Sequence, residues 1–225
     1  MPSTTPGTTG PDSPHQGQSL LWAGAPLAEA RGALVLVHGR GGSSEDILNL
    51  GLHLASEGVT LVAPAAAQHT WYPFRFLEPT HRNEPWLTSA LTVLDDVEAT
   101  LTESGIDSTR VVLVGFSQGA CLASESLRRR PRALGGLLAF AGGVIGPDAG
   151  GPGEGAALTG MPALFACGDA DPHIPAQRVR ESAALFTAMG AEVDVRLYKG
   201  MGHGIHPDGL RAGQTLVERV LPGPP

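Results

Sequence analysis

The chain is short of several residue types, and each shortage excludes a class of protein. It has two cysteines, Cys121 and Cys167, in separate apolar segments, so a disulfide framework is not indicated and a reducing compartment is expected. No apolar run approaches the roughly 20 residues that a membrane span needs. The first residues lack the basic and apolar regions of a secretory signal. These shortages predict a cytoplasmic protein with no integral membrane association.

Positive charge is also scarce. Lys199 is the only lysine, and the formal net charge is −7. Nucleic acids and anionic membrane surfaces bind basic surfaces, so both are poor partners for this chain. Hydrophobic residues make up 42% of the sequence and charged residues 16%, which is typical of a globular protein. A chain of 225 residues is long enough for one α/β domain with a sizeable core.

The first 18 residues are mostly Pro, Thr, Ser and Gly, with scarcely an apolar side chain. Such a segment cannot bury enough surface to offset the entropy lost on ordering. We therefore predict a disordered tail over residues 1–18 and a single domain over residues 19–222.

Apolar runs and helical segments alternate along the rest of the chain. The runs predict strands over residues 19–24 (an edge strand), 33–37, 59–64, 111–114, 134–140, 161–167 and 192–198. Five helices are expected. They begin after Ser43, at about residue 85 (ending at about 103), at the turn at Ser117 (ending at about 130), after Pro175 (ending at about 189) and at about residue 208. This alternation predicts a three-layer α/β fold, with a mostly parallel central sheet and helices on both faces.

The stretch over residues 111–120 carries the strongest chemical signal. An aliphatic strand runs into Gly115-Phe116-Ser117-Gln118-Gly119 and then into a helix. A strand that reverses sharply into a helix strains the residue at the turn, and the neighbours of that residue must be small. The pattern predicts a nucleophile elbow that lifts the Ser117 hydroxyl above the sheet edge. The alternative is an incidental serine in a glycine-rich turn.

Two later loops supply acids and histidines. Asp169 and Asp171 follow one predicted strand, and His203 and His206 follow the last one. The loops after parallel strands meet at the carboxyl edge of the sheet, where active sites form. A serine hydroxyl needs a base, and the base needs a carboxylate that fixes its tautomer. His203 directly follows Gly-Met-Gly after the strand and is favoured as the base, while either aspartate can serve as the acid.

The same loops contain possible metal ligands. One group comprises His203, His206 and Asp208, and the other comprises Cys167, Asp169, Asp171 and His173. Neither group has a familiar ligand spacing on a helix. We therefore expect no metal.

A glycine-rich loop, His38-Gly39-Arg40-Gly41-Gly42, follows the strand over residues 33–37. It lacks the G-x-G-x-x-G spacing and the Gly-Lys-Ser of a phosphate-binding loop. In a serine hydrolase, a His-Gly-x-Gly-Gly loop after an early strand supplies a backbone amide to an oxyanion. Together with Ser117, the loop favours an oxyanion hole in which Gly39 and Gly41 lie beside the substrate. His38 is expected to be a structural hydrogen-bonding residue.

The irregular stretch over residues 65–86 contains Trp71-Tyr72-Pro73-Phe74. A long aromatic loop in a compact domain is usually functional. Trp71, Tyr72, Phe74 and the elbow residue Phe116 are therefore candidate walls of a substrate pocket, which would favour small or aromatic esters over long acyl chains. The alternative is that the aromatic residues only fill the side of the core.

Four segments resemble the carboxylesterase/phospholipase branch of the α/β-hydrolases, which includes acyl-protein thioesterases and borders on dienelactone hydrolases. They are His38-Gly39-Arg40-Gly41, Gly115-Phe116-Ser117-Gln118-Gly119, Gly168-x-x-Asp171-x-x-Ile174-Pro175 and Gly200-Met201-Gly202-His203. The resemblance spans residues 34–216 and implies an α/β-hydrolase fold without a large cap domain. It also implies Asp171 as the acid and the backbone amides of Arg40 and Gln118 as oxyanion donors. Dienelactone hydrolases have a cysteine as the nucleophile, so Ser117 points away from them.

The sequence thus predicts a serine carboxylesterase that acts on a small ester through an acyl-enzyme. No cofactor is implied, and the protein is expected to be a monomer or homodimer. A thioesterase, lysophospholipase or lactonase with the same triad is the first alternative. A non-catalytic ligand-binding protein of this fold is a second one, although such proteins usually lose a member of the triad.

Overall fold

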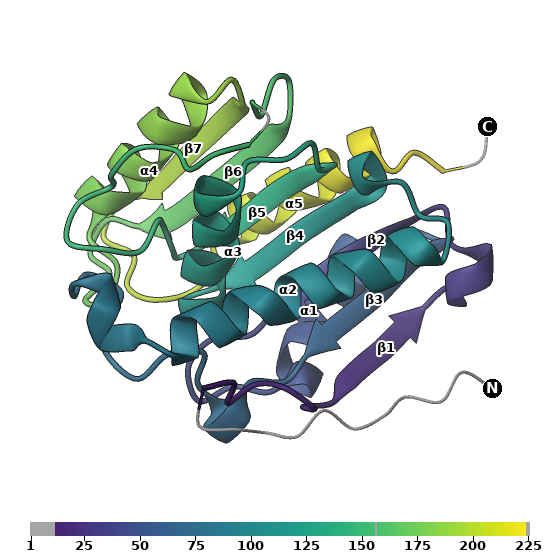
Figure 1. The fold of residues 1–225 in the computed structure, drawn as a ribbon. Coiled ribbons are helices and arrows are strands. Elements are labelled where there is room, and N and C mark those ends of the chain that lie inside the picture. The colour runs from purple at the N-terminus through teal and green to yellow at the C-terminus, as the bar shows by residue number, and fades with distance from the viewer. Residues whose placement is uncertain (1–11, 156, 224–225) are drawn as a thin grey trace.

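The computed structural model describes residues 12–155 and 157–223, in which helices cover both faces of a seven-stranded sheet (Figure 1). The strands are β1 (Leu20–Gly24), β2 (Gly32–Val37), β3 (Val59–Pro64), β4 (Val111–Phe116), β5 (Gly136–Phe140), β6 (Pro162–Gly168) and β7 (Glu192–Tyr198). The α-helices are α1 (Ser44–Leu54), α2 (Trp86–Glu103), α3 (Gln118–Arg129), α4 (Ala176–Ala188) and α5 (Pro207–Val220). Short 3-10 turns are η1 (Leu27–Glu29), η2 (Ala67–His69), η3 (Thr80–Asn83) and η4 (Ser108–Arg110).

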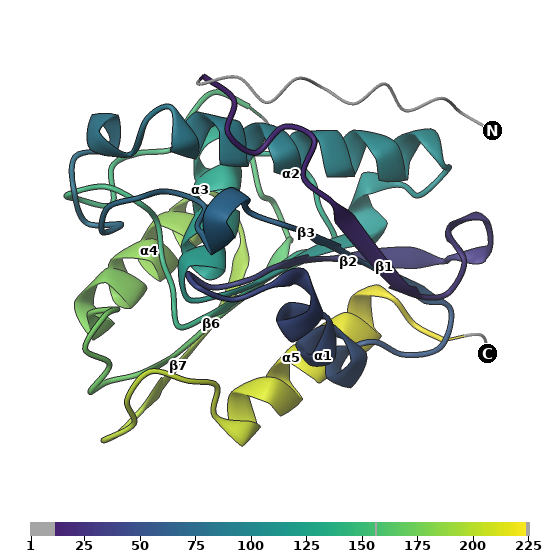
Figure 2. The ribbon, with the colours of Figure 1, turned by 90° about the horizontal axis from the view of Figure 1, so that it is seen from below.

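The strands lie in the order β1-β3-β2-β4-β5-β6-β7. Strand β1 is antiparallel to β3, and all other neighbouring strands are parallel. Helices α2, α3 and α4 pack on one face, and α1 and α5 on the other (Figures 1 and 2). The predicted three-layer, mostly parallel fold is confirmed, and no inserted cap domain occurs among the described elements. Nor is any described helix long and apolar enough to cross a membrane.

The strand order places two functional loops side by side. Strand β2 lies between β3 and β4, so the direction in which the chain adds strands reverses at β2. In open α/β sheets, ligands bind beyond the carboxyl ends of the strands at such a reversal. The loop after β2 contains Arg40, and the turn after β4 contains Ser117. These two loops are therefore neighbours at the carboxyl edge.

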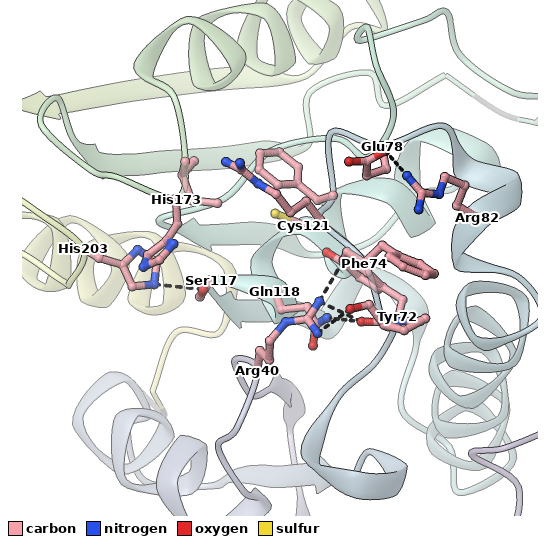
Figure 3. Close-up of a pocket in the computed structure, with 14 residues that line it drawn as sticks. Arg40, Tyr72, Phe74, Glu78, Arg82, Ser117, Gln118, Cys121, His173 and His203 are labelled. Atoms are coloured by element: carbon pink, nitrogen blue, oxygen red, sulfur yellow. Dashed lines mark hydrogen bonds and ion pairs between the residues drawn. The ribbon is translucent and has the colours of Figure 1, made fainter.

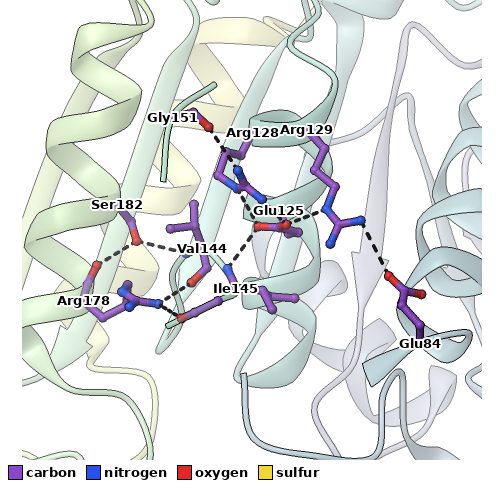
Figure 4. Close-up of polar contacts among 10 residues, drawn as sticks. Glu84, Glu125, Arg128, Arg129, Val144, Ile145, Gly151, Arg178 and Ser182 are labelled. Atoms are coloured by element: carbon purple, nitrogen blue, oxygen red, sulfur yellow. Dashed lines mark hydrogen bonds and ion pairs between the residues drawn. The ribbon is translucent and has the colours of Figure 1, made fainter. Parts of the chain in front are cut away.

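A buried carboxylate anchors the long loop after β5 (Figure 4). Glu125 on α3 is fully buried. Its Oε2 accepts hydrogen bonds from Arg128 Nε at 2.8 Å and from the backbone amide of Ile145 at 3.1 Å, and its Oε1 accepts one from Arg129 Nε at 2.6 Å. From α4, the Arg178 guanidinium donates to the carbonyls of Val144, Gly146 and Pro147, in the same loop. Charged groups from two helices thus hold the backbone of residues 144–147 in place.

Part of the predicted N-terminal tail is ordered. Of residues 1–18, the first 11 lie outside the described chain, but the expectation of disorder is wrong for the residues that follow. His15 is only 1% exposed, and its ring centroid lies 5.4 Å from that of Trp71 and 5.3 Å from that of Trp86. The amide of Ala67 donates to His15 Nδ1 at 3.1 Å, so Nε2 carries the proton and donates to the Trp71 carbonyl at 2.9 Å. The buried ring of His15 thus anchors the end of a segment that has few apolar side chains of its own.

Candidate active site

Ser117 lies at the turn between β4 and α3 in a strained backbone conformation. Its φ is 55° and its ψ is −120°, a region that residues other than glycine rarely adopt. A Cβ on Gly115 would lie 2.5 Å from the backbone of Ala120, and one on Gly119 would lie 2.0 Å from the carbonyl oxygen of Val37. Glycine is therefore required on both sides of the serine. The turn places Ser117 at the N-terminus of α3, where the helix dipole favours negative charge.

His203 connects Ser117 to Asp171. Its Nε2 lies 2.9 Å from Ser117 Oγ, and its Nδ1 lies 2.7 Å from Asp171 Oδ2. Figure 3 draws the hydrogen bond between His203 and Ser117. The imidazole packs between the rings of Phe116 and His173, each with its centroid 5.1 Å away. In this geometry, a neutral His203 with its proton on Nδ1 can accept the hydroxyl proton of Ser117.

The environment of Asp171 keeps its carboxylate ionised. The side chain is fully buried, and Oδ1 accepts hydrogen bonds from the amides of His173 at 2.8 Å and Ile174 at 3.0 Å. Burial raises the pKa of Asp171, but the hydrogen bonds from His203 and from these two amides outweigh it and lower the pKa below its ordinary value. A buried, ionised carboxylate is the partner that a histidine base requires.

The rival acid and base are engaged elsewhere. Asp169 Oδ1 accepts a hydrogen bond from the amide of Gly200 at 2.7 Å, which ties two loops together. His206 caps α5, since its Nδ1 accepts from the amide of Asp208 at 3.1 Å. Within the described ranges, no group of three or more His, Cys, Asp or Glu residues is arranged to hold a metal ion.

The two amides expected to bind an oxyanion lie next to the serine. A Cβ on Gly39 would meet Ser117 Cβ at 3.3 Å, so the loop after β2 touches the elbow. Among the described residues, no loop or cap hydrogen bond uses the amide of Arg40 or Gln118. Gln118 is the first residue of α3, where an amide has no acceptor within the helix. Both N–H groups are thus available to a substrate oxygen.

A pocket of about 550 Å³ opens over the serine and the histidine (Figure 3). It is lined by Arg40, Tyr72, Pro73, Phe74, Arg75, Phe76, Glu78, Arg82, Ser117, Gln118, Cys121, His173, Ile174 and His203. Of the residues predicted to contact substrate, Tyr72 and Phe74 are therefore at the pocket. Phe74 is 44% exposed and stacks under the Arg82 guanidinium, which lies 4.6 Å from the ring centroid.

Trp71 does not line the pocket, and its prediction as a wall residue is wrong. The side chain is fully buried, its Nε1 donates to the His38 carbonyl at 2.9 Å, and its ring centroid lies 5.0 Å from that of His38. The core-filling alternative holds for this residue, because a large ring with a bonded N–H is well satisfied in the interior. Gly39, Gly41 and Phe116 are also absent from the lining. The two glycines belong to the loop after β2, and Phe116 packs on the histidine.

Sequence reasoning missed several residues of the pocket. His173 lies two residues after Asp171, and this spacing was the signal that could have placed it at the site. Cys121 follows Ser117 by four residues, one helical turn, so the two share a side of α3. Burial raises the pKa of the Cys121 thiol to about 12, so it stays protonated at neutral pH. The ion pair between Glu78 and Arg82, 2.9 Å long, has an i,i+4 spacing and joins the residues before η3 to this short 3-10 turn.

Comparisons of the sequence and of the structure with known proteins point to the same family. The sequence profile of a family described as phospholipase/carboxylesterase matches residues 24–221. A crystal structure of a phospholipase/carboxylesterase from Dyadobacter fermentans is 35% identical, has a TM-score of 0.85, and covers 89% of this chain and 96% of its own.

Two acyl-protein thioesterases also match. Acyl-protein thioesterase 1 of Gibberella zeae is 31% identical over 124 residues, or 53% of this chain and 52% of the relative. The matched region thus spans about half of that relative's length. Acyl-protein thioesterase 1 of Saccharomyces cerevisiae is 25% identical over 89% of this chain and 98% of its own length.

Proposed function

The chain belongs to the phospholipase/carboxylesterase family and has the α/β-hydrolase fold, and from this premise we propose that it is a serine esterase. The observation that carries the proposal is the continuous hydrogen-bonded chain from Ser117 through His203 to the buried Asp171. The three groups have the arrangement that nucleophilic catalysis needs, and Ser117 and His203 line the pocket.

In the proposed reaction, Ser117 Oγ attacks the ester carbonyl while His203 Nε2 takes the hydroxyl proton. Asp171 stabilises the imidazolium that forms, and the amides of Arg40 and Gln118 stabilise the negative charge on the carbonyl oxygen. His203 then gives the proton to the leaving alcohol, which departs and leaves an acyl-enzyme. A water molecule, deprotonated by the same histidine, releases the acid and restores the serine. The reaction uses no cofactor.

The substrate we propose is a small or aromatic ester. Aromatic side chains from one segment, Tyr72, Phe74 and Phe76, line the pocket and present rigid apolar faces beside the serine. Thioester cleavage is a second candidate, because two matched relatives are named acyl-protein thioesterases. The same attack on the carbonyl carbon serves both bonds, and only the leaving group differs.

We also propose the cytoplasm as the location. Both cysteines are free and buried. Burial raises the pKa of each thiol to about 12, so both remain protonated and unreactive at neutral pH. Two free thiols fit a reducing compartment, where disulfides are rare.

The proposal is tested by labelling and by turnover. A fluorophosphonate probe should modify wild-type protein at Ser117, as mapped by mass spectrometry, and Ser117→Ala should lower turnover of p-nitrophenyl acetate at least roughly a thousandfold. Ser104→Ala, which changes an exposed serine at the end of α2, is the matched control and should keep wild-type turnover. A label on another residue, or no label with no hydrolysis, would refute the esterase. Parallel measurements of turnover with phenyl acetate and S-phenyl thioacetate compare an ester with the matching thioester.

A further inference from the structure

Arg40 holds the backbone of one pocket wall. Residues 72–74, here called the wall segment, line the pocket. Arg40 Nη1 donates to the carbonyl of Pro73, and Nη2 donates to the carbonyls of Tyr72 and Phe74, all at 2.8 Å (Figure 3). The guanidinium carbon also lies 6.0 Å from the centroid of the Tyr72 ring. One side chain thus binds three successive carbonyl groups.

The guanidinium has no other partner in the described part of the chain. Arg40 takes part in none of the ion pairs there, although the residue is exposed and lines the pocket. Both N–H groups of Nη2 and one of Nη1 are already bonded to the wall segment. The bidentate face that an arginine offers to a substrate anion is therefore occupied by the protein's own backbone.

Gln118 bonds the same segment from the other loop. Its Oε1 accepts from the amide of Trp71 at 2.9 Å, and its Nε2 donates to the carbonyl of Tyr72 at 2.8 Å. Arg40 and Gln118 are the two residues whose backbone amides face the position of the substrate oxygen in the proposed reaction. Their side chains thus connect the two loops that carry these amides to the wall segment and to Trp71 before it.

We propose that Arg40 is a positioning residue that sets the width of the pocket and so determines which acyl groups fit beside Ser117. The inference rests on the esterase activity proposed above. Without the guanidinium, the carbonyls of Pro73 and Phe74 lose their donor and turn to water for hydrogen bonds, while the Tyr72 carbonyl keeps only its bonds from the side chains of Gln118 and Thr70. The wall segment then moves away from the loop after β2, and the space over the serine widens. Because the wall excludes large groups by contact, its release favours longer acyl chains.

The test compares acyl chain lengths in variants of Arg40. Arg40→Met removes every donor but keeps an unbranched side chain, so the backbone amide of the loop stays in place. The measured quantity is kcat/KM for p-nitrophenyl acetate, butyrate and octanoate. We expect the octanoate-to-acetate ratio to rise at least about fivefold, mainly through a lower KM for octanoate. Arg40→Lys keeps some of the donors and should give a smaller rise.

Arg180→Met is the matched control, because Arg180 is exposed on α4, outside the pocket lining. It should reproduce the wild-type ratio. An unchanged ratio in Arg40→Met, or an equal loss of activity on all three esters, would overturn the inference. If circular dichroism shows that Arg40→Met is unfolded, Arg40→Lys takes its place, and an octanoate-to-acetate ratio equal to that of the wild type would then overturn the inference. A wild-type protein that neither hydrolyses esters nor reacts with fluorophosphonate refutes the esterase itself, which separates the two failures.

Discussion

Replacing Asp171 by asparagine should reduce turnover far more than the same change at Asp169. Asparagine has the shape of aspartate, and its carbonyl oxygen can still accept hydrogen bonds from the amides of His173 and Ile174. Its NH₂ group then takes the place of Oδ2, 2.7 Å from His203 Nδ1. An NH₂ group is a donor, so it requires an unprotonated Nδ1 and places the imidazole proton on Nε2.

A histidine protonated on Nε2 cannot accept the serine proton. The expected loss in kcat is up to about ten-thousandfold, which corresponds to about 5.4 kcal/mol of transition-state stabilisation. Asp169 instead bonds the amide of Gly200, and the carbonyl oxygen of asparagine can still accept that hydrogen bond. For Asp169→Asn we therefore expect a loss below about tenfold.

The assay is initial-rate hydrolysis of p-nitrophenyl acetate under saturating conditions, together with the rate of fluorophosphonate labelling. Thermal melting of both variants checks that the fold is retained. A larger loss in Asp169→Asn than in Asp171→Asn would show that the acid is Asp169. Small losses in both variants would show that neither aspartate is the acid on which His203 depends.

Two further predictions concern stability. Trp71→Ala should lower the free energy of unfolding by about 3–5 kcal/mol and leave the acyl-chain preference unchanged, because the ring fills the core and does not line the pocket. Urea denaturation measures the loss of stability, and kcat/KM for the p-nitrophenyl ester series measures the preference. Burial lowers the pKa of His15 and His38 below the ordinary 6.5, so the unfolded chain binds protons more readily and stability should fall as the pH drops below about 6.5. His15→Gln, which does not titrate, should reduce the slope of stability against pH between 7 and 5, and an unchanged slope would contradict this account.

The fold could be read from the sequence because its signals are local. Strands β3 and β7 have the predicted bounds, since buried aliphatic runs and flanking turn residues define them. Strand β5 was predicted to start at residue 134, but it begins at Gly136 because its pairing with β4 begins there. The start of α1 after Ser43 is also set locally, because Ser43 and Asp46 form a capping box within one turn.

The side chains around the site were less predictable, because their positions depend on contacts between distant segments. The sequence shows that Trp71 lies in an aromatic loop, but its contacts with His15 and His38, 56 and 33 residues away, make it a core residue. The contact between Arg40 and residues 72–74 likewise needs β2 and β3 to be neighbours. The order Ser117, Asp171, His203 was visible because each residue lies in the turn or loop that follows a strand. Local pattern thus locates the loops, and tertiary packing decides which of their side chains face the pocket.

The strained backbone of Ser117 has an evolutionary consequence. A non-glycine residue held in such a conformation costs about 1–3 kcal/mol of folding free energy, which glycine at the same position would avoid. A mutant chain with Ser117→Gly is thus expected to be more stable and to have no nucleophile. Random drift under selection for stability alone would therefore remove the serine. A library of variants screened only for heat resistance would be enriched in inactive chains, so any programme to stabilise this protein must select for turnover at the same time.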